Sequence, residues 1–295
     1  MLVYLNGAYV DGSNARISVD DRGFLFGDGV YEVTRVLGGR LFAGDRHMRR
    51  LERGMRELEL RWPEGLDASG LRAVSERLLH ENDLVQGEAV VYAQVTRGVA
   101  ARTHAFPPSG TPPTVYVAVS PFKPIDELRA QGAAAVTVAD IRWGRCDLKT
   151  IQLLPNVLAK QRAAAADAFE AVQVRDGVVT EGASTNVFVV LDGVLRTHPA
   201  DQRILAGVTR EIVLELAREL RLSAREEAVT VAELRRASEV LVTGTTTDVM
   251  PVVRLDGRPV GTGRPGPLGR RLHAGLRARM DQSPEQELAT GSIAY

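Results

Sequence analysis

Alternating apolar and polar positions mark several short strands in the first 120 residues. The segment VYLNGAYV alternates on both sides of Asn6-Gly7, a pair typical of tight hairpin turns. GVYEVTRVLGGRLF predicts two more strands around Gly38-Gly39, and EAVVYAQVTRG and TVYVAVS predict a further pair. Residues 19–29 are rich in glycine and aspartate and therefore predict a loop.

Helical spacing appears between these strands. Apolar residues recur every three or four positions from Asp45 to Leu60, with Asp45 as the N-cap, and a second helix is expected at 69–81. The last two strands are joined by VAARTHAFPPSGTPP, a long proline-containing segment. Long ordered loops in compact enzymes are often functional.

The second half mixes strands and helices. AAAVTVADIRW predicts a strand, and EAVQVRDGVVTEG and TNVFVVLDGVLRTH predict hairpins that turn at Asp176-Gly177 and Asp192-Gly193. NVLAKQRAAAADA and GVTREIVLELARELR predict helices, and EVLVTGTTTDVMPVV predicts two strands around a hydroxyl-rich loop. The pattern indicates an α+β protein.

A proline-rich stretch, SPFKPIDE, separates the two halves. We therefore expect an N-terminal domain at 1–120, a linker at 121–124 and a C-terminal domain at 125–281. The polar tail, 282–295, is expected to be disordered.

Composition narrows the possible functions. The chain has 295 residues, 44% hydrophobic and 25% charged, and its 37 acidic residues balance 37 basic ones. The absence of a basic excess argues against nucleic-acid binding. No apolar run reaches membrane-spanning length, and the N-terminus does not resemble a secretory signal. The single cysteine excludes an internal disulfide and any Cys-based zinc cluster, and no metal centre is expected. Because neither a membrane-spanning run nor a secretory signal is found, a soluble cytoplasmic protein is expected.

Lysine is unusually rare. The basic residues include only Lys123, Lys149 and Lys160; every other one is arginine. Lys149 stands among apolar residues in RCDLKTIQLLPN, where such surroundings disfavour the ammonium and expose a nucleophilic lone pair. Arginine cannot form an imine, so lysine should persist where imine chemistry is needed. An ion pair between Lys149 and Asp147 is the structural alternative.

An imine-forming lysine acts either alone or with pyridoxal 5'-phosphate (PLP). That cofactor requires an anion site, an acid at its ring nitrogen and a wall for its ring. AGVTRE places Gly207, Val208 and Thr209 at a helix start, and TGTTTD offers further donors after a strand. Glu181, at the end of a strand in TEGAST, could hold a pyridinium proton. Each feature is weak alone, and only their coincidence with Lys149 is informative.

Taken in order, these stretches resemble the fold-type IV PLP enzymes, the class IV aminotransferases, and within them the bacterial D-amino-acid transaminases. The matching segments run from the first strand to the last: DRGFLFGDGVYEV, QVTRG with RTHAFP, DIRWGRCDLKTIQLLPNVLAKQ, VTEGASTNVF, THPA, LAGVTRE and VTGTTTDVMPV. The resemblance implies a smaller N-terminal domain and a larger C-terminal domain with a mixed, barrel-like sheet. It also implies a homodimer with its active sites near the interface.

The resemblance also assigns the cofactor residues. Lys149 corresponds to the Schiff-base lysine, and Glu181 to the glutamate that keeps the pyridine nitrogen protonated. The remaining PLP contacts, to the phosphate and to the ring face, would come from Arg50, Leu205, Val208, Thr209, Gly244 and Thr245.

The substrate carboxylate would be bound by Tyr31, Arg102 and His104. Residues two apart in an extended segment point to the same side, so the Arg-x-His pair can act together, and a guanidinium can grip a carboxylate in bidentate fashion. Ala183 replaces a serine of the bacillus enzymes and Gly144 a bulkier residue, which leaves the preferred side chain open.

The expected reaction is transamination between a D-amino acid such as D-alanine and a 2-oxo acid such as 2-oxoglutarate. Within the family the alternatives are a branched-chain L-amino-acid aminotransferase, an (R)-amine transaminase and aminodeoxychorismate lyase. Outside it, they are a cofactor-free imine enzyme and a non-catalytic dimeric scaffold.

Overall fold

The computed structural model describes residues 1–282, which divide into two compact units. Unit 1 comprises Met1–Lys123 together with Leu148–Leu153, and unit 2 comprises Pro124–Asp147 and the chain from Leu154 onward. The bounds expected from the sequence do not separate Leu148–Leu153 from its neighbours. Apart from Gln282, the tail expected to be disordered lies outside the described residues.

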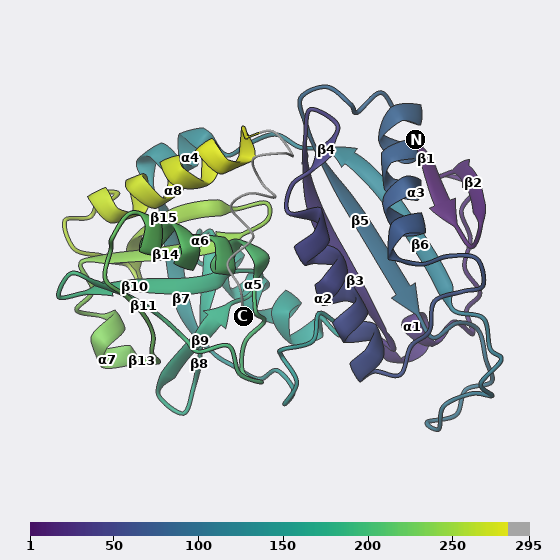
Figure 1. Cartoon of the computed structure of the whole chain (residues 1–295). Coiled ribbons are helices and arrows are strands. Elements are labelled where there is room, and N and C mark those ends of the chain that lie inside the picture. Colours follow the sequence, from purple (N-terminus) through teal and green to yellow (C-terminus); the bar gives the residue numbers. More distant parts are fainter. Residues whose placement is uncertain (283–295) are drawn as a thin grey trace. The chain divides into compact units, whose positions relative to one another are not determined.

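Unit 1 is an antiparallel sheet covered by two helices. Its strands lie in the order β2-β1-β6-β5-β3-β4. Helices α2 and α3 pack on one face of this sheet (Figure 1). The elements are β1 (Leu2–Leu5), β2 (Ala8–Asp11), α1 (Arg22–Phe26), β3 (Gly29–Leu37), β4 (Arg40–Leu41), α2 (Gly44–Glu57), α3 (Ala68–Glu81), β5 (Glu88–Thr96) and β6 (Thr114–Pro121).

The core of unit 1 follows the two-residue period of its strands. In β5, Ala89, Val91, Ala93 and Val95 are buried and pack toward α2 and α3. The residues between them lie on the other face and are half-buried. This alternation leaves one face of the sheet available for side chains that do not belong to the core.

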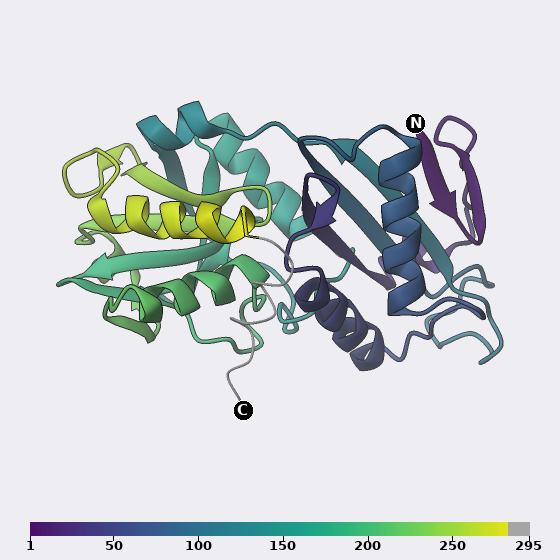
Figure 2. The same cartoon turned by 45° about the horizontal axis from the view of Figure 1, so that its top comes forward.

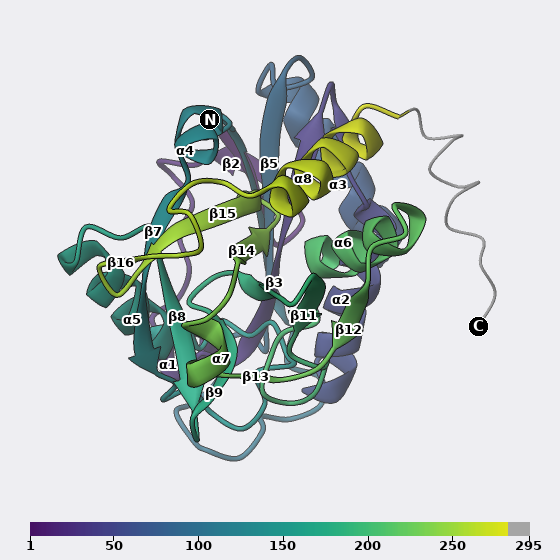
Figure 3. The ribbon, with the colours of Figure 1, turned by 90° about the vertical axis from the view of Figure 1, so that its left-hand side faces the viewer.

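Unit 2 is built on a mixed ten-stranded sheet. Its main path is β12-β11-β10-β14-β15-β7-β8-β9-β13, and β16 pairs with β15. The pairs β11/β12, β15/β7 and β7/β8 are parallel, and the other pairs are antiparallel. Figure 3 shows that the sheet curls into a partial barrel. The expectation of a mixed, barrel-like sheet in an α+β protein is confirmed.

The helices of unit 2 cover this sheet. Helix α5 packs on β7 and β8, whereas α6 and α8 pack on β14 and β15 and lie side by side (Figure 2). The elements are α4 (Asp126–Gln131), β7 (Ala133–Ala139), α5 (Leu154–Ala165), β8 (Glu170–Arg175), β9 (Val178–Gly182), β10 (Asn186–Leu191), β11 (Val194–Thr197), α6 (Val208–Glu219), β12 (Ala224–Glu226), β13 (Val229–Thr230), α7 (Val231–Leu234), β14 (Glu239–Gly244), β15 (Asp248–Leu255), β16 (Arg258–Pro259) and α8 (Pro267–Met280).

The structure departs from the expected elements in several places: α4 and α7 were not predicted, and the N-cap of α2 is Ala43, whereas Asp45 lies in its first turn. The segment expected as a loop at 19–29 contains α1, whose N-cap Asp21 accepts a hydrogen bond from the backbone of Gly23 and whose C-cap Gly27 has φ +69°. Five residues are too few to show helical periodicity. Helix α8 was also not predicted, because glycine and arginine surround its buried apolar stripe.

Candidate functional site

Lys149 lies in the short segment that joins unit 1 from the second half of the chain. This segment runs alongside the start of β3: the Tyr31 amide donates to the Lys149 carbonyl at 3.0 Å, and the Ile151 amide donates to the Gly29 carbonyl at 3.1 Å. The Lys149 Nζ atom lies 4.1 Å from the centre of the Tyr31 ring. An aromatic face attracts a cation, so the Tyr31 ring helps to fix the position of the amine.

Glu32 follows Tyr31 on β3 and points to the other face of the sheet, toward α2. Its carboxylate accepts hydrogen bonds from Arg50 Nε at 2.7 Å and Arg50 Nη2 at 2.9 Å, and His47 Nδ1 lies 2.9 Å away. Burial favours the protonated carboxyl, yet the Arg50 guanidinium and the bonds from Arg50 and His47 hold the pKa of Glu32 well below its usual range. Arg50 is therefore oriented by an ionised, buried partner.

Burial lowers the pKa of His47, although Glu32 acts in the opposite sense. The positive charges of Arg50 and Lys149 lower it further, so the Lys149 amine is within electrostatic reach of this cluster. A neutral His47 leaves Arg50 as the cation that the Glu32 carboxylate holds.

Three tyrosines form a row on the less buried face of the sheet. The Tyr31 and Tyr92 rings stack with centroids 5.6 Å apart, and the Tyr116 ring lies 6.3 Å from that of Tyr92. The Tyr92 hydroxyl donates to Gln94 Oε1 at 2.6 Å. Burial and the neighbouring phenols raise the pKa of Tyr92 to about 12, so it remains a neutral donor.

Arg102 and His104 lie in the loop between β5 and β6, and both are exposed. The structure brings the two side chains to one ring: the His104 ring centre is 5.8 Å from that of Phe26, and the Arg102 Cζ atom is 5.3 Å from it.

In unit 2, Glu181 is the penultimate residue of β9, and its carboxylate is buried. Its Oε1 atom accepts from Arg142 Nη1. Its Oε2 atom accepts from Asn186 Nδ2 at 2.9 Å and from the Leu205 amide at 3.0 Å. Burial raises the pKa of Glu181 to about 7, while the charge and hydrogen bond of Arg142 oppose that rise.

Arg142 connects Glu181 to a second buried acid, Asp140. The Arg142 guanidinium donates to Asp140 from Nε at 2.9 Å and from Nη2 at 2.8 Å. Although burial acts against ionisation, these bonds lower the pKa of Asp140 to about 2. Arg175 Nη2 lies 3.0 Å from the same carboxylate. Glu181 is therefore the last member of a buried, hydrogen-bonded network that also includes Arg142 and Asp140.

The start of α6 lies beside this network. Its N-cap, Gly207, makes no side-chain capping bond, and a Cβ atom there would lie 2.1 Å from Asn186 Oδ1. Val208 and Thr209 begin the helix and are buried. The Asn186 amide also donates to the Leu205 carbonyl at 2.8 Å, so one side chain holds both the Glu181 carboxylate and the approach to the helix.

The turn between β14 and β15 begins after Gly244, the last residue of β14, and carries Thr245. It is closed by a hydrogen bond from the Thr247 amide to the Gly244 carbonyl at 3.1 Å. Behind it, Arg129 Nη2 donates to the Thr247 carbonyl and to Asp248 Oδ2, both at 3.3 Å. A short, braced turn rich in hydroxyl and amide donors is suited to an anion.

Three residues that hold these groups in place were not expected from the sequence. Glu32, Asn186 and Arg142 each bond directly to an expected site residue, yet none was predicted. A signal existed for Arg142, which stands with an acid in DIRWGRCD, a polar stretch placed directly after a strand.

The structure also places the other residues that the sequence analysis considered. Ala183 is buried, and Gly144 faces open space. Cys146 is buried, and its thiol donates to the Trp143 carbonyl at 3.2 Å. Asp147, the alternative partner considered for Lys149, is paired with Arg145 at 2.9 Å.

Within residues 1–282, no helix has both the length and the apolar character needed to cross a membrane. In the same part of the chain, no group of three or more His, Cys, Asp or Glu side chains is arranged to hold a metal ion.

Comparison with known proteins decides the family. The sequence pattern of the family described as "Amino-transferase class IV" matches residues 29–255. The chain belongs to the class IV aminotransferases. The fold-type IV assignment and the expectation of an aminotransferase are thereby confirmed.

The relatives of this class IV aminotransferase agree with the assignment. It is 43% identical over 279 residues to the D-alanine aminotransferase of Staphylococcus aureus strain MSSA476, an alignment that covers 93% of this chain and 96% of the relative. It is 42% identical to the D-alanine aminotransferase of Bacillus licheniformis over 94% of this chain and 96% of that one.

A solved relative shares the fold. The T.th. branched-chain amino acid aminotransferase, crystallised with pyridoxamine 5'-phosphate, superposes with a TM-score of 0.88. It is 27% identical, and the match covers 97% of this chain and 96% of that chain.

Proposed function

We propose that this aminotransferase moves an amino group between a D-amino acid, such as D-alanine, and a 2-oxo acid, such as 2-oxoglutarate, with PLP as its cofactor. The observation that carries the proposal is the setting of Lys149, whose amine is held over the Tyr31 ring by backbone pairing with β3. The similarity to curated D-alanine aminotransferases over more than nine-tenths of the chain supports the choice of substrate.

The residues of each unit suit the cofactor. In unit 1, Lys149 Nζ is the amine that would attach PLP covalently, and Arg50, oriented by Glu32, would bind its phosphate. In unit 2, the buried Glu181 would accept a hydrogen bond from the pyridine nitrogen. When bound, PLP supplies the electron sink that makes the substrate Cα–H acidic.

The anion-binding features of unit 2 would serve the phosphate. The first amides of α6, at Val208 and Thr209, form a helix N-terminus without a side-chain cap, and such termini attract phosphate. Gly244 and Thr245 would add donors from the braced turn after β14, and Leu205 would lie against the ring.

The protein groups divide the work of proton transfer and orientation. Lys149 Nζ would remove the proton from the substrate Cα. Tyr31, Arg102 and His104 would hold the α-carboxylate, so that one enantiomer directs its Cα–H toward the lysine. The gathering of Arg102 and His104 at the Phe26 ring supports this shared role.

A branched-chain L-amino-acid aminotransferase is the second candidate, favoured by the fold shared with the T.th. enzyme. The lower identity to that enzyme, 27% against 43% for the D-alanine aminotransferase, supports the first assignment. An (R)-amine transaminase is the third candidate, and it would not need the Arg102 carboxylate contact.

We also infer a homodimer, as the family resemblance implies. Helix α5 presents an apolar stripe to solvent, because Leu154, Val157 and Leu158 are 68%, 58% and 50% exposed. In unit 1, Phe24 and Val19 are also exposed, at 68% and 71%. An exposed apolar stripe such as that on α5 is typical of interfaces. A cytoplasmic location stays a prediction that cell fractionation would test.

The test is a visible spectrum followed by paired assays. The purified enzyme should be yellow or take up PLP, and the colour should change when D-alanine is added. D-alanine should then outpace L-leucine with 2-oxoglutarate as the acceptor. Faster turnover of L-leucine would favour the second candidate, and a protein that never binds PLP would end the proposal.

The variant Arg102→Ala separates the first candidate from the third. It should raise the KM for D-alanine while leaving the binding of PLP unchanged, because the loop residue would contact the substrate alone. Unchanged KM would show that Arg102 does not hold the carboxylate.

A further inference from the structure

The loop from Val99 to Pro113 is fastened to unit 1 at its base. Val99 pairs with Asp21 in an isolated bridge, and the Arg22 amide donates to the Gly98 carbonyl at 2.9 Å. Gly98 has φ +90°, and a Cβ atom there would lie 1.9 Å from the Pro112 carbonyl oxygen. Both ends of the loop therefore meet at a point where only glycine fits.

Above this base, the side chain of Arg22 reaches into the loop. Arg22 is 3% exposed, and its Nη1 atom donates to the Thr103 carbonyl at 2.7 Å and lies 3.4 Å from the Ala105 carbonyl. Its Nε atom donates to Asp28 Oδ2 at 2.8 Å. The two carbonyls stand on either side of His104, so the Arg22 guanidinium fixes the backbone that carries this residue.

A second buried arginine shares the same acid. Arg97 donates to Asp28 from Nε at 2.8 Å and from Nη2 at 3.0 Å, and its Cζ atom lies 3.7 Å from the centre of the Phe106 ring. Arg97 also donates to the carbonyls of Leu58 and Glu59. One aspartate therefore holds two arginines, one at the Thr103 backbone and one at the Phe106 ring.

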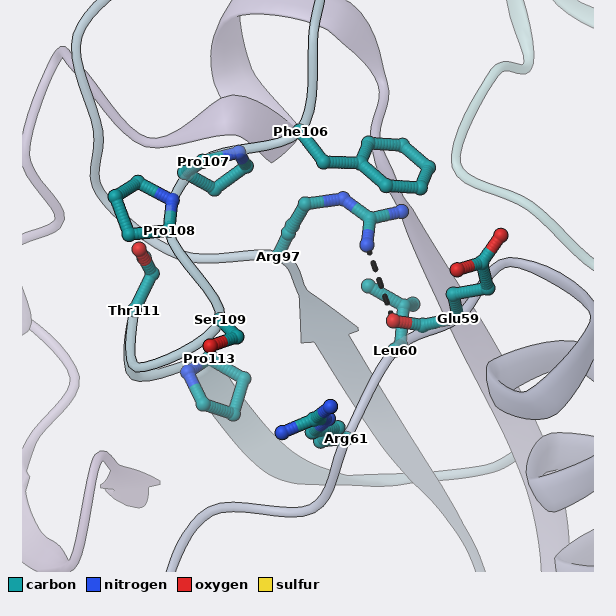
Figure 4. A pocket seen from close by; sticks show the side chains of 10 residues that line it. All are labelled: Glu59, Leu60, Arg61, Arg97, Phe106, Pro107, Pro108, Ser109, Thr111 and Pro113. Atoms are coloured by element: carbon teal, nitrogen blue, oxygen red, sulfur yellow. Dashed lines mark hydrogen bonds between the residues drawn. The ribbon is translucent and has the colours of Figure 1, made fainter.

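A cavity adjoins the distal part of the loop. This cavity, of about 170 Å³, lies between the distal half of the loop, 106–113, and the segment around Leu60, and Figure 4 shows Arg97 and Phe106 among the residues that line it. A poorly packed segment has little dispersion energy to hold one position. The polar anchors at Asp28 therefore decide where the loop lies.

The Arg22 guanidinium also contacts the aromatic ring that lies beside Arg102 and His104. The Arg22 Cζ atom is 4.7 Å from the centre of Phe26, the ring that also contacts Arg102 and His104. Arg22 therefore contacts the surroundings of Arg102 and His104 at two points, the Thr103 carbonyl and the Phe26 ring.

We propose that Arg22, held by Asp28, is a positioning residue that presents Arg102 and His104 to the substrate carboxylate and thereby sets the affinity for α-amino acids. The proposal rests on the proposed function. Arg22 makes no contact with the carboxylate itself. Its role is to keep the loop backbone in the register at which Arg102 can form a bidentate contact.

The experiment compares Arg22→Met and Arg22→Lys with wild type and with Arg16→Met. Arg16 is an exposed arginine that bonds to carbonyls of its own segment, and it serves as the matched control. For each PLP-loaded enzyme the measurements are KM and kcat for D-alanine, the inhibition constant of propionate against D-alanine, and the dissociation constant of PLP. Propionate tests the carboxylate contact apart from the chemistry.

Arg22→Met should raise KM and the propionate constant about tenfold or more, because a misplacement of about 1 Å can cost about 100-fold. The kcat and the PLP dissociation constant should stay within about twofold of wild type. For Arg22→Lys, KM and the propionate constant should lie between those of wild type and Arg22→Met, since an ammonium can still pair with Asp28 and donate to one carbonyl. Arg16→Met should match wild type.

Other outcomes would overturn the proposal. Unchanged KM and propionate binding in Arg22→Met would refute the positioning role, and equal losses in carboxylate and PLP affinity would show a general structural role. If Arg22→Met does not fold, Arg22→Lys decides by the same criteria. A wild-type enzyme that does not turn over D-alanine would instead refute the proposed function, and this inference with it.

Discussion

The substitution Arg142→Met tests the buried network behind Glu181. The Arg142 side chain is 5% exposed and neutralises two acids, Asp140 and Glu181, whose side chains are 0% and 8% exposed. Methionine keeps most of the volume but removes the charge and all of the hydrogen bonds. Two buried carboxylates then lose their shared partner, although Arg175 remains 3.0 Å from Asp140.

The expected loss of unfolding free energy follows from burial. Removing one member of a buried ion pair costs roughly 3–5 kcal/mol, because the remaining charge stays desolvated. Because Arg175 still pairs with Asp140, we expect a loss of unfolding free energy at the lower end of this range, about 3 kcal/mol at pH 7. At pH 8.5, Glu181→Gln in the same background should recover part of the loss, because it removes a carboxyl that must either ionise without a partner or take up a proton on folding.

The pH dependence gives a sharper signature. The pKa of Glu181 is raised from 4.5 to about 7 in the folded protein, so folded Glu181 binds its proton more tightly than unfolded Glu181 and stability falls as pH rises through this window. Without Arg142, burial and the Asp140 charge move the folded pKa higher still. The variant therefore continues to lose about 1.4 kcal/mol per pH unit where wild type has levelled off.

The assay is urea unfolding of the cofactor-free proteins at pH 5.5, 7 and 8.5. A Trp62→Phe background leaves Trp143, which adjoins Arg142, as the fluorescent reporter of unit 2. The deficit of Arg142→Met should grow from pH 5.5 to pH 8.5. A deficit that is constant with pH, or smaller than about 1 kcal/mol throughout, would refute the account of a charged network.

Three further predictions concern other parts of the molecule. Glu32→Gln should weaken PLP binding by releasing Arg50. It should also remove a contribution to the unfolding free energy that wild type loses only as pH falls, since the pKa of Glu32 is lowered on folding. Identical acid-unfolding curves for the two proteins would contradict this. Gly207→Ala should displace the Asn186 side chain from the Glu181 carboxylate, because the new Cβ would lie 2.1 Å from its Oδ1 atom; fluorescence titration should show weaker PLP binding, and unchanged affinity would count against the assignment. Leu158→Glu places a charge on the exposed apolar stripe of α5, and light scattering should show the loss of dimers, whereas an intact dimer would place the interface elsewhere.

The sequence predicted those parts of the fold that local patterns determine. The alternation in EAVVYAQVTRG specifies β5 and the face that it buries, and the aspartate-glycine pairs at 176–177 and 192–193 specify two hairpins. The stretches around Lys149 and Glu181 also carried enough pattern to indicate a family.

The parts that could not be predicted depend on contacts between distant residues. No local pattern shows that Leu148–Leu153 pairs with the start of β3 in the other half of the chain. Likewise, Glu32 and Arg50 are 18 positions apart, and the bond between them forms only because α2 packs on the sheet beside β3. Arg22 reaches the Thr103 backbone by the same kind of long-range contact.

The attachment of PLP to Lys149 is tested most directly by loading the enzyme with PLP, reducing it with borohydride and mapping the modified peptide by mass spectrometry. The pyridoxyl group should be found on Lys149, and Lys149→Arg should leave the protein unlabelled and inactive. Labelling of Lys123 or Lys160, or an unmodified Lys149 in active enzyme, would contradict it.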